Sequence, residues 1–167
     1  GCDDGRLTAA LRRSDAYTVQ GLVADTEDVG PARDHIASRG LSGEVSVRHW
    51  DRPWMPLVDG LADLVVVEKP ENVSEAEVMR ITSPGGVVLT KESDGWTRRV
   101  KQWPGDIDEW THYLHEPDNN AVARDTEVGK PFHLQWAGKP KQGRHHDHLA
   151  GISSIVSANG RMFDIED

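Results

Sequence analysis

The fold is decided by residues 1–11, which read GCDDGRLTAAL. The glycines at positions 1 and 5 predict a tight turn, and the apolar spacing after it predicts a helix over Leu7–Arg13. Glycine lets the backbone of such a turn pass close to a ligand, and the helix behind it presents unpaired N–H groups. We therefore expect the first strand-to-helix turn of a nucleotide-binding sheet, with its strand absent from this sequence.

Strand-like and helical stretches alternate after this turn. Strands are predicted at Tyr17–Ala24, Val45–Val47, Leu61–Val67 and Val87–Thr90, and helices at 26–38 and 75–81. The run Leu61–Val67 is nearly all apolar, which is typical of a central parallel strand covered on both faces. The alternation predicts an α/β fold, a doubly wound parallel sheet with its ligand at the carboxyl ends of the strands.

Residues 1 to about 91 resemble the core of a class I S-adenosylmethionine-dependent methyltransferase. The matching pieces are, in order, GCDDGRLTAAL, GLVADTEDVGPARDHIASRGL, VSVRHWD, LADLVVV and EVMRITSPGGVVL. The resemblance implies a Rossmann-like domain over residues 1–101 whose sheet lacks its first strand, so that the neighbouring strands leave apolar edges open. It also implies S-adenosylmethionine as the cofactor.

The resemblance implies three contacts with that cofactor. In the family, the glycine turn approaches the methionine part, an acid ending the second strand holds the ribose, and an acid after the third strand lies near the adenine. The last two roles fall on Val23 and Asp51, with Asp25 as the substitute for Val23. The turn falls on Gly1, Asp3 and Gly5.

Asp3 and Val23 depart from the family pattern, and both departures oppose the cofactor. Asp3 places a negative charge where bare backbone would meet the ligand's carboxylate. Val23 cannot accept a hydrogen bond from ribose, a loss of roughly ten- to a hundredfold in affinity. Glu68 and Lys69 follow the fourth strand without the Asn-Pro-Pro-aromatic signature of amino-group methyltransferases, so we favour a solvated strand end over a catalytic base at Glu68.

Two functions follow for this domain. The first is a degenerate methyltransferase-like module with a structural or binding role. The second is an active methyltransferase of unknown acceptor, because methyl transfer to a small molecule can rely largely on positioning.

The remaining third has a different character. Ser93-Asp94-Gly95 predicts a hairpin with a returning strand over Trp96–Lys101, and residues 102–120 predict an ordered linker with a short helix at Asp108–Leu114. Further strands are predicted at Phe132–Trp136 and on both sides of Asn159-Gly160, over 152–156 and 162–165.

Residues 121–167, with the segment before them, resemble the first strands of a quinoprotein-like β-propeller. The resemblance is found in the stretches IDEWTHYLHEPDNNAVARDTEVGKPFHLQWAG and RHHDHLAGISSIVSANGRMFDIED. The resemblance implies an internal fragment of a large bacterial protein, packing against the rest of the propeller, and a periplasmic or extracellular location. It also implies pyrroloquinoline quinone for the complete propeller, and hence a third function, a quinone-dependent oxidoreductase.

Histidines gather in this part of the chain. One cluster is His145-His146-Asp147-His148, and His112 and His115 form a pair three residues apart. These side chains could bind a metal ion, or they could form a polar loop at the rim of a propeller. We favour the rim and predict no metal. Arg144 and these histidines are candidates for the mouth of a propeller pocket.

Composition narrows the partners. The 167 residues carry a net charge of −9, which argues against a nucleic-acid surface, and no apolar run reaches membrane-spanning length. The single Cys2 excludes an internal disulfide. A small-molecule ligand is therefore the expected partner.

Overall fold

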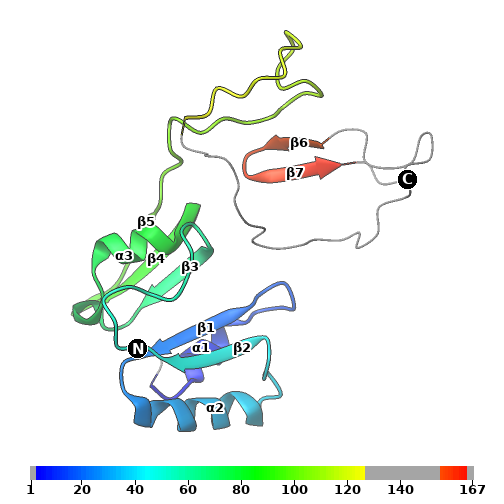
Figure 1. Ribbon diagram of the computed structural model, residues 1–167. Helices are drawn as coiled ribbons and strands as arrows, with labels where there is room; N and C mark the ends of the chain where they lie inside the picture. Colours follow the sequence, from blue (N-terminus) through cyan, green and yellow to red (C-terminus); the bar gives the residue numbers. More distant parts are fainter. Residues whose placement is uncertain (1–2, 127–154, 165–167) are drawn as a thin grey trace. The chain divides into compact units, whose positions relative to one another are not determined.

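The computed structural model describes residues 3–126 and 155–164. The chain divides into two compact units, Gly1–Gln102 (unit 1) and Trp103–Asp167 (unit 2). Figure 1 labels their helices and strands. Unit 1 contains α1 (Arg6–Leu11), β1 (Val19–Val23), η1 (Thr26–Asp28), α2 (Val29–Ser38), β2 (Val45–His49), β3 (Ala62–Val67), η2 (Pro70–Asn72), α3 (Glu75–Ile81), β4 (Thr82–Glu92) and β5 (Gly95–Val100). Unit 2 contains β6 (Ile155–Ala158) and β7 (Arg161–Asp164).

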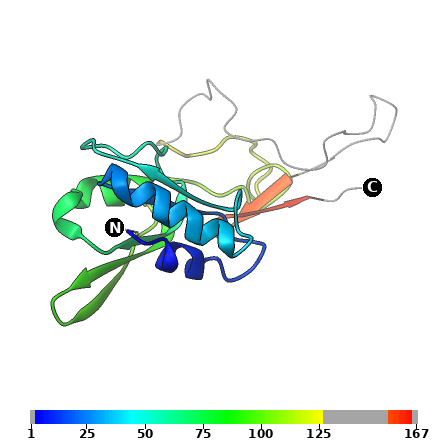
Figure 2. The same cartoon turned by 90° about the horizontal axis from the view of Figure 1, so that it is seen from below.

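The first sheet of unit 1 pairs β1 with β2 in parallel, with Val19 opposite Val45 and Val23 opposite His49. Helices α1 and α2 lie together against this sheet, as Figures 1 and 2 show from two directions. Their small and branched side chains pack against those of the strands, because each helix and each strand has one apolar face that is buried. The resulting first core consists of Ala9, Val23, Ala32, Ile36, Val45 and Val47.

The second sheet has the order β3-β4-β5, with β3 and β4 parallel and β5 antiparallel to β4. Helix α3 packs on it and forms a second core with Met55, Val67, Val78, Ile81 and Val88. Leu22 packs against this second core, whereas Val23, the next residue of β1, belongs to the first. Because successive side chains of a strand point to opposite faces, β1 has a core on each of its two faces, as in a doubly wound fold.

Local signals explain where the helices begin and end. The Asp25 carboxylate accepts a hydrogen bond from the Glu27 N–H at the start of η1, and the Ser74 hydroxyl accepts one from the Glu77 N–H at the start of α3. Gly40, with φ of 69°, follows α2 as the predicted stop. The predicted helix 26–38 is thus confirmed, with a 3-10 turn as its first part.

The prediction of one sheet with a fully covered central strand is wrong in part. In the described residues β1 and β3 belong to separate sheets, and β3 pairs only with β4. One edge of β3 is therefore without a strand partner in this part of the chain. Leu61 and Leu64 are accordingly 55% and 42% exposed, although their sequence run is that of a central strand.

In unit 2, β6 and β7 form the predicted hairpin. Asn159 and Gly160 both have positive φ, 52° and 71°, as the two-residue hairpin turn requires. The helix predicted at Asp108–Leu114 is wrong, because His112 and His115 instead exchange two backbone hydrogen bonds across a tight turn. The predicted strand at Phe132–Trp136 lies outside the described residues. The propeller stays a prediction.

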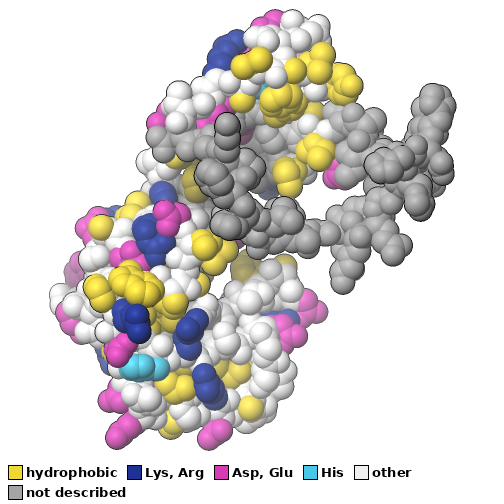
Figure 3. All heavy atoms as spheres, in the orientation of Figure 1, with side chains coloured by type: hydrophobic (Ala, Val, Ile, Leu, Met, Phe, Trp, Pro, Cys, Tyr) yellow, Lys and Arg dark blue, Asp and Glu magenta, His cyan; other side chains and the backbone are white. Residues whose placement is uncertain are grey.

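The described residues include no helix long and apolar enough to cross a membrane. On the face of unit 1 shown in Figure 3, acidic and basic side chains are interspersed rather than gathered by sign.

Candidate functional site

The candidate site is the carboxyl edge of the strands in unit 1. The Trp50 N–H donates to the Val23 carbonyl at 2.8 Å, and His49 Nε2 lies 3.1 Å from the Ala24 carbonyl oxygen. The segments that follow β1 and β2 are thereby held together. Asp25 and Asp51 lie in these two segments and are both exposed, so the structure places them at the same edge of the sheet.

Position 23 offers nothing to a ligand at this edge. Val23 has no exposed surface and packs in the first core with Ala32 and Ile36. Asp25 remains the acid closest in sequence, and one of its oxygens is engaged in capping η1. The position that the family resemblance assigns to a ribose acid is therefore a core position in this chain.

The turn before α1 is fixed by close packing. Gly5 has φ of 72°, and a Cβ built on it would lie 2.6 Å from the Ala32 carbonyl oxygen in α2. Asp4 Oδ1 accepts a hydrogen bond from the Arg6 N–H at 3.0 Å. The structure thus explains Gly5 by helix packing, while Gly1 lies outside the described residues.

Asp3 and Lys69 form an ion pair at this edge, with Nζ 2.7 Å from Oδ2. The hydrogen bond from Lys69 lowers the pKa of Asp3, and the same contact raises the pKa of Lys69. Lys69 is thus half-exposed at the end of β3, and its cation balances the charge of Asp3. The expected repulsion between Asp3 and a ligand's carboxylate stays a prediction.

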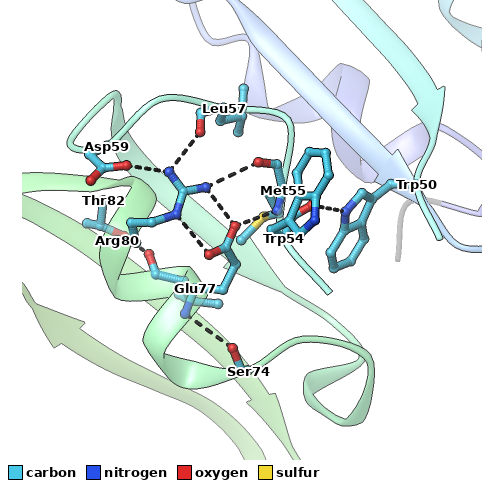
Figure 4. A network of polar contacts seen from close by, with 10 residues as sticks. Trp50, Trp54, Met55, Leu57, Asp59, Ser74, Glu77, Arg80 and Thr82 are labelled. Carbon is cyan, nitrogen blue, oxygen red and sulfur yellow. Dashed lines mark hydrogen bonds and ion pairs between the residues drawn. The ribbon is translucent and has the colours of Figure 1, made fainter. Parts of the chain in front are cut away.

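A network centred on Arg80 holds the segment that carries Asp51 (Figure 4). Arg80 donates to both carboxylate oxygens of Glu77, and to the carbonyls of Met55 at 3.1 Å and Leu57 at 2.9 Å. It also pairs with Asp59, and the Met55 N–H donates to Glu77. The hydrogen bond from Arg80 lowers the pKa of Glu77 although burial of this carboxylate acts in the other direction.

Sequence reasoning missed this network. The only local signal is the spacing of Glu77 and Arg80, three residues apart on one face of α3. The segment is further ordered by Trp50 Nε1, which donates to the Trp54 carbonyl at 2.8 Å, and by Arg52, which lies 5.4 Å from the Trp54 ring centre. The loop beside the candidate site is therefore anchored at both of its ends.

A shallow cavity of about 330 Å³ opens where β3 and β4 end. Its walls combine aliphatic side chains with charged and hydroxyl groups. It is lined by Val67, Pro70, Val73, Glu75, Val78, Thr90, Glu92, Thr97 and Arg99.

The described histidines of unit 2 have structural partners. His115 is 1% exposed, and its Nε2 lies 2.6 Å from Asp108 Oδ2, with Trp110 edge-on to its ring. The Arg124 N–H also donates to Asp108, and this hydrogen bond and that of His115 lower the pKa of Asp108. Within residues 3–126 and 155–164, no three acidic, histidine or cysteine side chains are grouped as for a metal. Arg144 and His145–His148 lie outside the described residues.

No protein-family model matches this chain, and no curated protein sequence matches it. Among solved structures it is similar to the [4+2]-cyclase SpnF, at 26% identity and a TM-score of 0.50 over 55% of this chain and 36% of that one. A putative S-adenosyl-L-methionine-dependent methyltransferase from Methanococcus maripaludis is 24% identical, with a TM-score of 0.49 over 55% of this chain and 44% of that one. A SAM dependent methyltransferase from Aquifex aeolicus is 20% identical, with a TM-score of 0.48 over 54% of this chain and 52% of that one.

The chain thus spans between about a third and a half of these proteins. The match with the cyclase, together with the order of helices and strands in unit 1, supports a Rossmann-like α/β fold.

Proposed function

We propose that unit 1 is a binding module of the methyltransferase type that holds S-adenosylmethionine at the carboxyl edge of β1, β2 and β3. The observation that carries the proposal is the meeting of Asp25 and Asp51 at this edge, where the Trp50 to Val23 hydrogen bond ties the two segments together. Ligands of open α/β folds bind outside the carboxyl ends of the strands, which is where these two segments lie.

The same geometry argues that the module binds this cofactor with reduced affinity. A buried valine replaces the ribose acceptor at position 23, and Asp25 stands two residues farther along the chain. We therefore propose binding weaker than a complete site would give, by roughly ten- to a hundredfold for one missing charged hydrogen bond.

Calorimetric titration of S-adenosylmethionine into the full chain tests the proposal. We expect saturable binding that weakens about tenfold in Asp51→Asn and stays unchanged in Asp34→Asn, an equally small charge change on the exposed face of α2. Absence of binding by the unmodified chain, or equal effects of the two variants, would refute the proposal.

A second candidate is methyl transfer to a small acceptor. It is favoured by the cavity of about 330 Å³ beside Pro70, which is close to the lower size limit of small-molecule sites and lies at the same end of β3 as the proposed cofactor edge. Release of S-adenosylhomocysteine during incubation with a panel of small amines and alcohols would establish this activity. A panel that releases none above the background without protein leaves the binding module as the function.

For unit 2 we propose the start of a quinoprotein-like β-propeller outside the cytoplasm. The hairpin of β6 and β7 supports a β architecture there. A quinone bound by a longer polypeptide containing several such hairpins would support this proposal, and an α-helical continuation would overturn it.

A further inference from the structure

The cavity of about 330 Å³ in unit 1 has an aliphatic wall and a polar wall. The aliphatic wall consists of Val67 at the end of β3, Pro70, Val73, and Val78 on α3. Val67 and Val78 also belong to the second core, so the packing of α3 on the sheet holds this wall in place. Such a wall accepts a short alkyl chain, and the volume is close to the lower limit of small-molecule sites.

The polar wall comes from the hairpin of β4 and β5. Thr90 and Thr97 lie directly opposite each other in the strand ladder, which places their Cβ atoms about 5 Å apart. Glu92 is two residues after Thr90 and therefore on the same face of β4, and its carboxylate accepts a hydrogen bond from the Thr97 hydroxyl at 2.7 Å. All three residues line the cavity. The polar wall thus presents three side chains with acceptor oxygens to a single head group.

The charges at the cavity are unequal. Its lining carries the two carboxylates of Glu75 and Glu92 and the one guanidinium of Arg99. Arg99 forms an ion pair with Glu75. Among the described residues, Glu92 has the Thr97 hydroxyl as its partner and makes no ion pair. The polar wall therefore keeps a net negative charge, which attracts a cation and repels a carboxylate.

We propose that this cavity binds a small primary amine in its charged form, with the ammonium group on the polar wall and the alkyl chain on the aliphatic wall. A primary ammonium group has three N–H donors, one for each acceptor side chain of the polar wall. The Thr97 hydroxyl accepts such a bond while it donates to Glu92, because its oxygen has two lone pairs. An alcohol lacks the charge, and a quaternary ammonium ion lacks the donors.

This inference rests on the second candidate function, because it names the class of the methyl acceptor. Binding is measured without the cofactor, by titrating n-butylamine into the full chain and following NMR signals. The methyl signals of Val73 report on the aliphatic wall, and the amide signals of Thr90 and Thr97 report on the polar wall. We expect saturable shifts of both sets in the millimolar range, about fivefold lower affinity for N,N,N-trimethylbutylammonium, and no shifts with butyrate. Equal affinity for butyrate or for the trimethylated ion would overturn the inference.

A pair of variants tests the charge of the polar wall. Glu92→Gln keeps the side-chain size and removes the charge, and we expect it to weaken the binding of n-butylamine about fivefold. Glu44→Gln makes the same change at an exposed position before β2 and should leave the affinity unchanged. The urea midpoint of each variant separates loss of binding from loss of folding. Equal affinities of the two folded variants would contradict the role of Glu92.

The outcomes for binding and for methyl transfer are distinguishable. Binding of n-butylamine at the two walls without release of S-adenosylhomocysteine would sustain this inference and remove methyl transfer to such amines. Release of S-adenosylhomocysteine with alcohols, in a chain that does not bind n-butylamine, would sustain the second candidate function and overturn the inference.

Discussion

Val23→Asp places an acid where the family resemblance requires one, and the structure predicts that it unfolds unit 1 at neutral pH. The valine has no exposed surface, and its neighbours in the first core are apolar. Losing its burial costs about 1.5–3 kcal/mol, and burying an unpaired carboxyl group costs roughly a further 1–3 kcal/mol.

Ionisation adds a pH-dependent part to this cost. Burial raises the pKa of an introduced aspartate, so the folded state keeps its proton at pH values where the unfolded state has lost it. The penalty is absent below the unfolded pKa of about 4 and grows by about 1.4 kcal/mol for each pH unit above it. Between pH 4 and pH 7 it reaches roughly 4 kcal/mol. The total approaches the whole stability of a small domain, about 5–15 kcal/mol.

Urea denaturation followed by circular dichroism at pH 4.5 and pH 7 measures the effect. Val23→Thr is the matched control, because it keeps the side-chain shape and adds a hydroxyl without a titrating group. We expect Val23→Asp to be much less stable than Val23→Thr at pH 7 and to recover most of the difference at pH 4.5. Equal stability of the two variants at both pH values would show that position 23 reaches solvent, and it would return this position to the ligand site.

Three further predictions concern the framework of unit 1. Gly5→Ala should destabilise the fold by roughly 2–4 kcal/mol in thermal or urea unfolding, since it combines positive φ with a Cβ 2.6 Å from the Ala32 oxygen, whereas Gly30→Ala, with nothing within 4 Å, should not destabilise it. Ser74→Ala should lower stability by about 1 kcal/mol through loss of the α3 cap, and Ser14→Ala, at a loop position, should have a smaller effect in the same assay. Because Arg80 lowers the pKa of Glu77, the stability that this pair contributes is present above the ordinary pKa of 4.5 and is lost as the pH falls through the lower pKa of the folded state. The urea midpoint, measured from pH 5 to pH 2.5, should decline less steeply in Glu77→Gln than in the unmodified chain. Parallel declines would contradict the assignment.

The elements of unit 1 were predictable because their signals are local. The cap at Ser74, the glycine after α2 and the alternating apolar runs each act within a few residues, and the structure confirms the elements they predict. The hairpin turn at Asn159-Gly160 was equally predictable, because few pairs of neighbouring residues both adopt positive φ.

The contacts that shape the candidate site were not predictable in this way. Lys69 lies 66 residues from Asp3, and Arg80 lies 21 from Asp59. Pairing over such separations depends on how the strands are arranged, which no local pattern encodes. The exposure of Leu64 has the same origin, since an apolar run indicates what a strand can pack against but does not say that a neighbouring strand is present.

The Arg80 network has a consequence for how unit 1 opens. The segment from Met55 to Asp59 has carbonyls and a carboxylate fastened to one guanidinium on α3, and that helix contributes Val78 and Ile81 to the second core. Fraying of α3 therefore releases the loop next to Asp51 at the same moment. In hydrogen exchange, the amides of this loop and of α3 should open as one cooperative unit, and a ligand seated at the carboxyl edge should slow exchange in a helix that it does not touch.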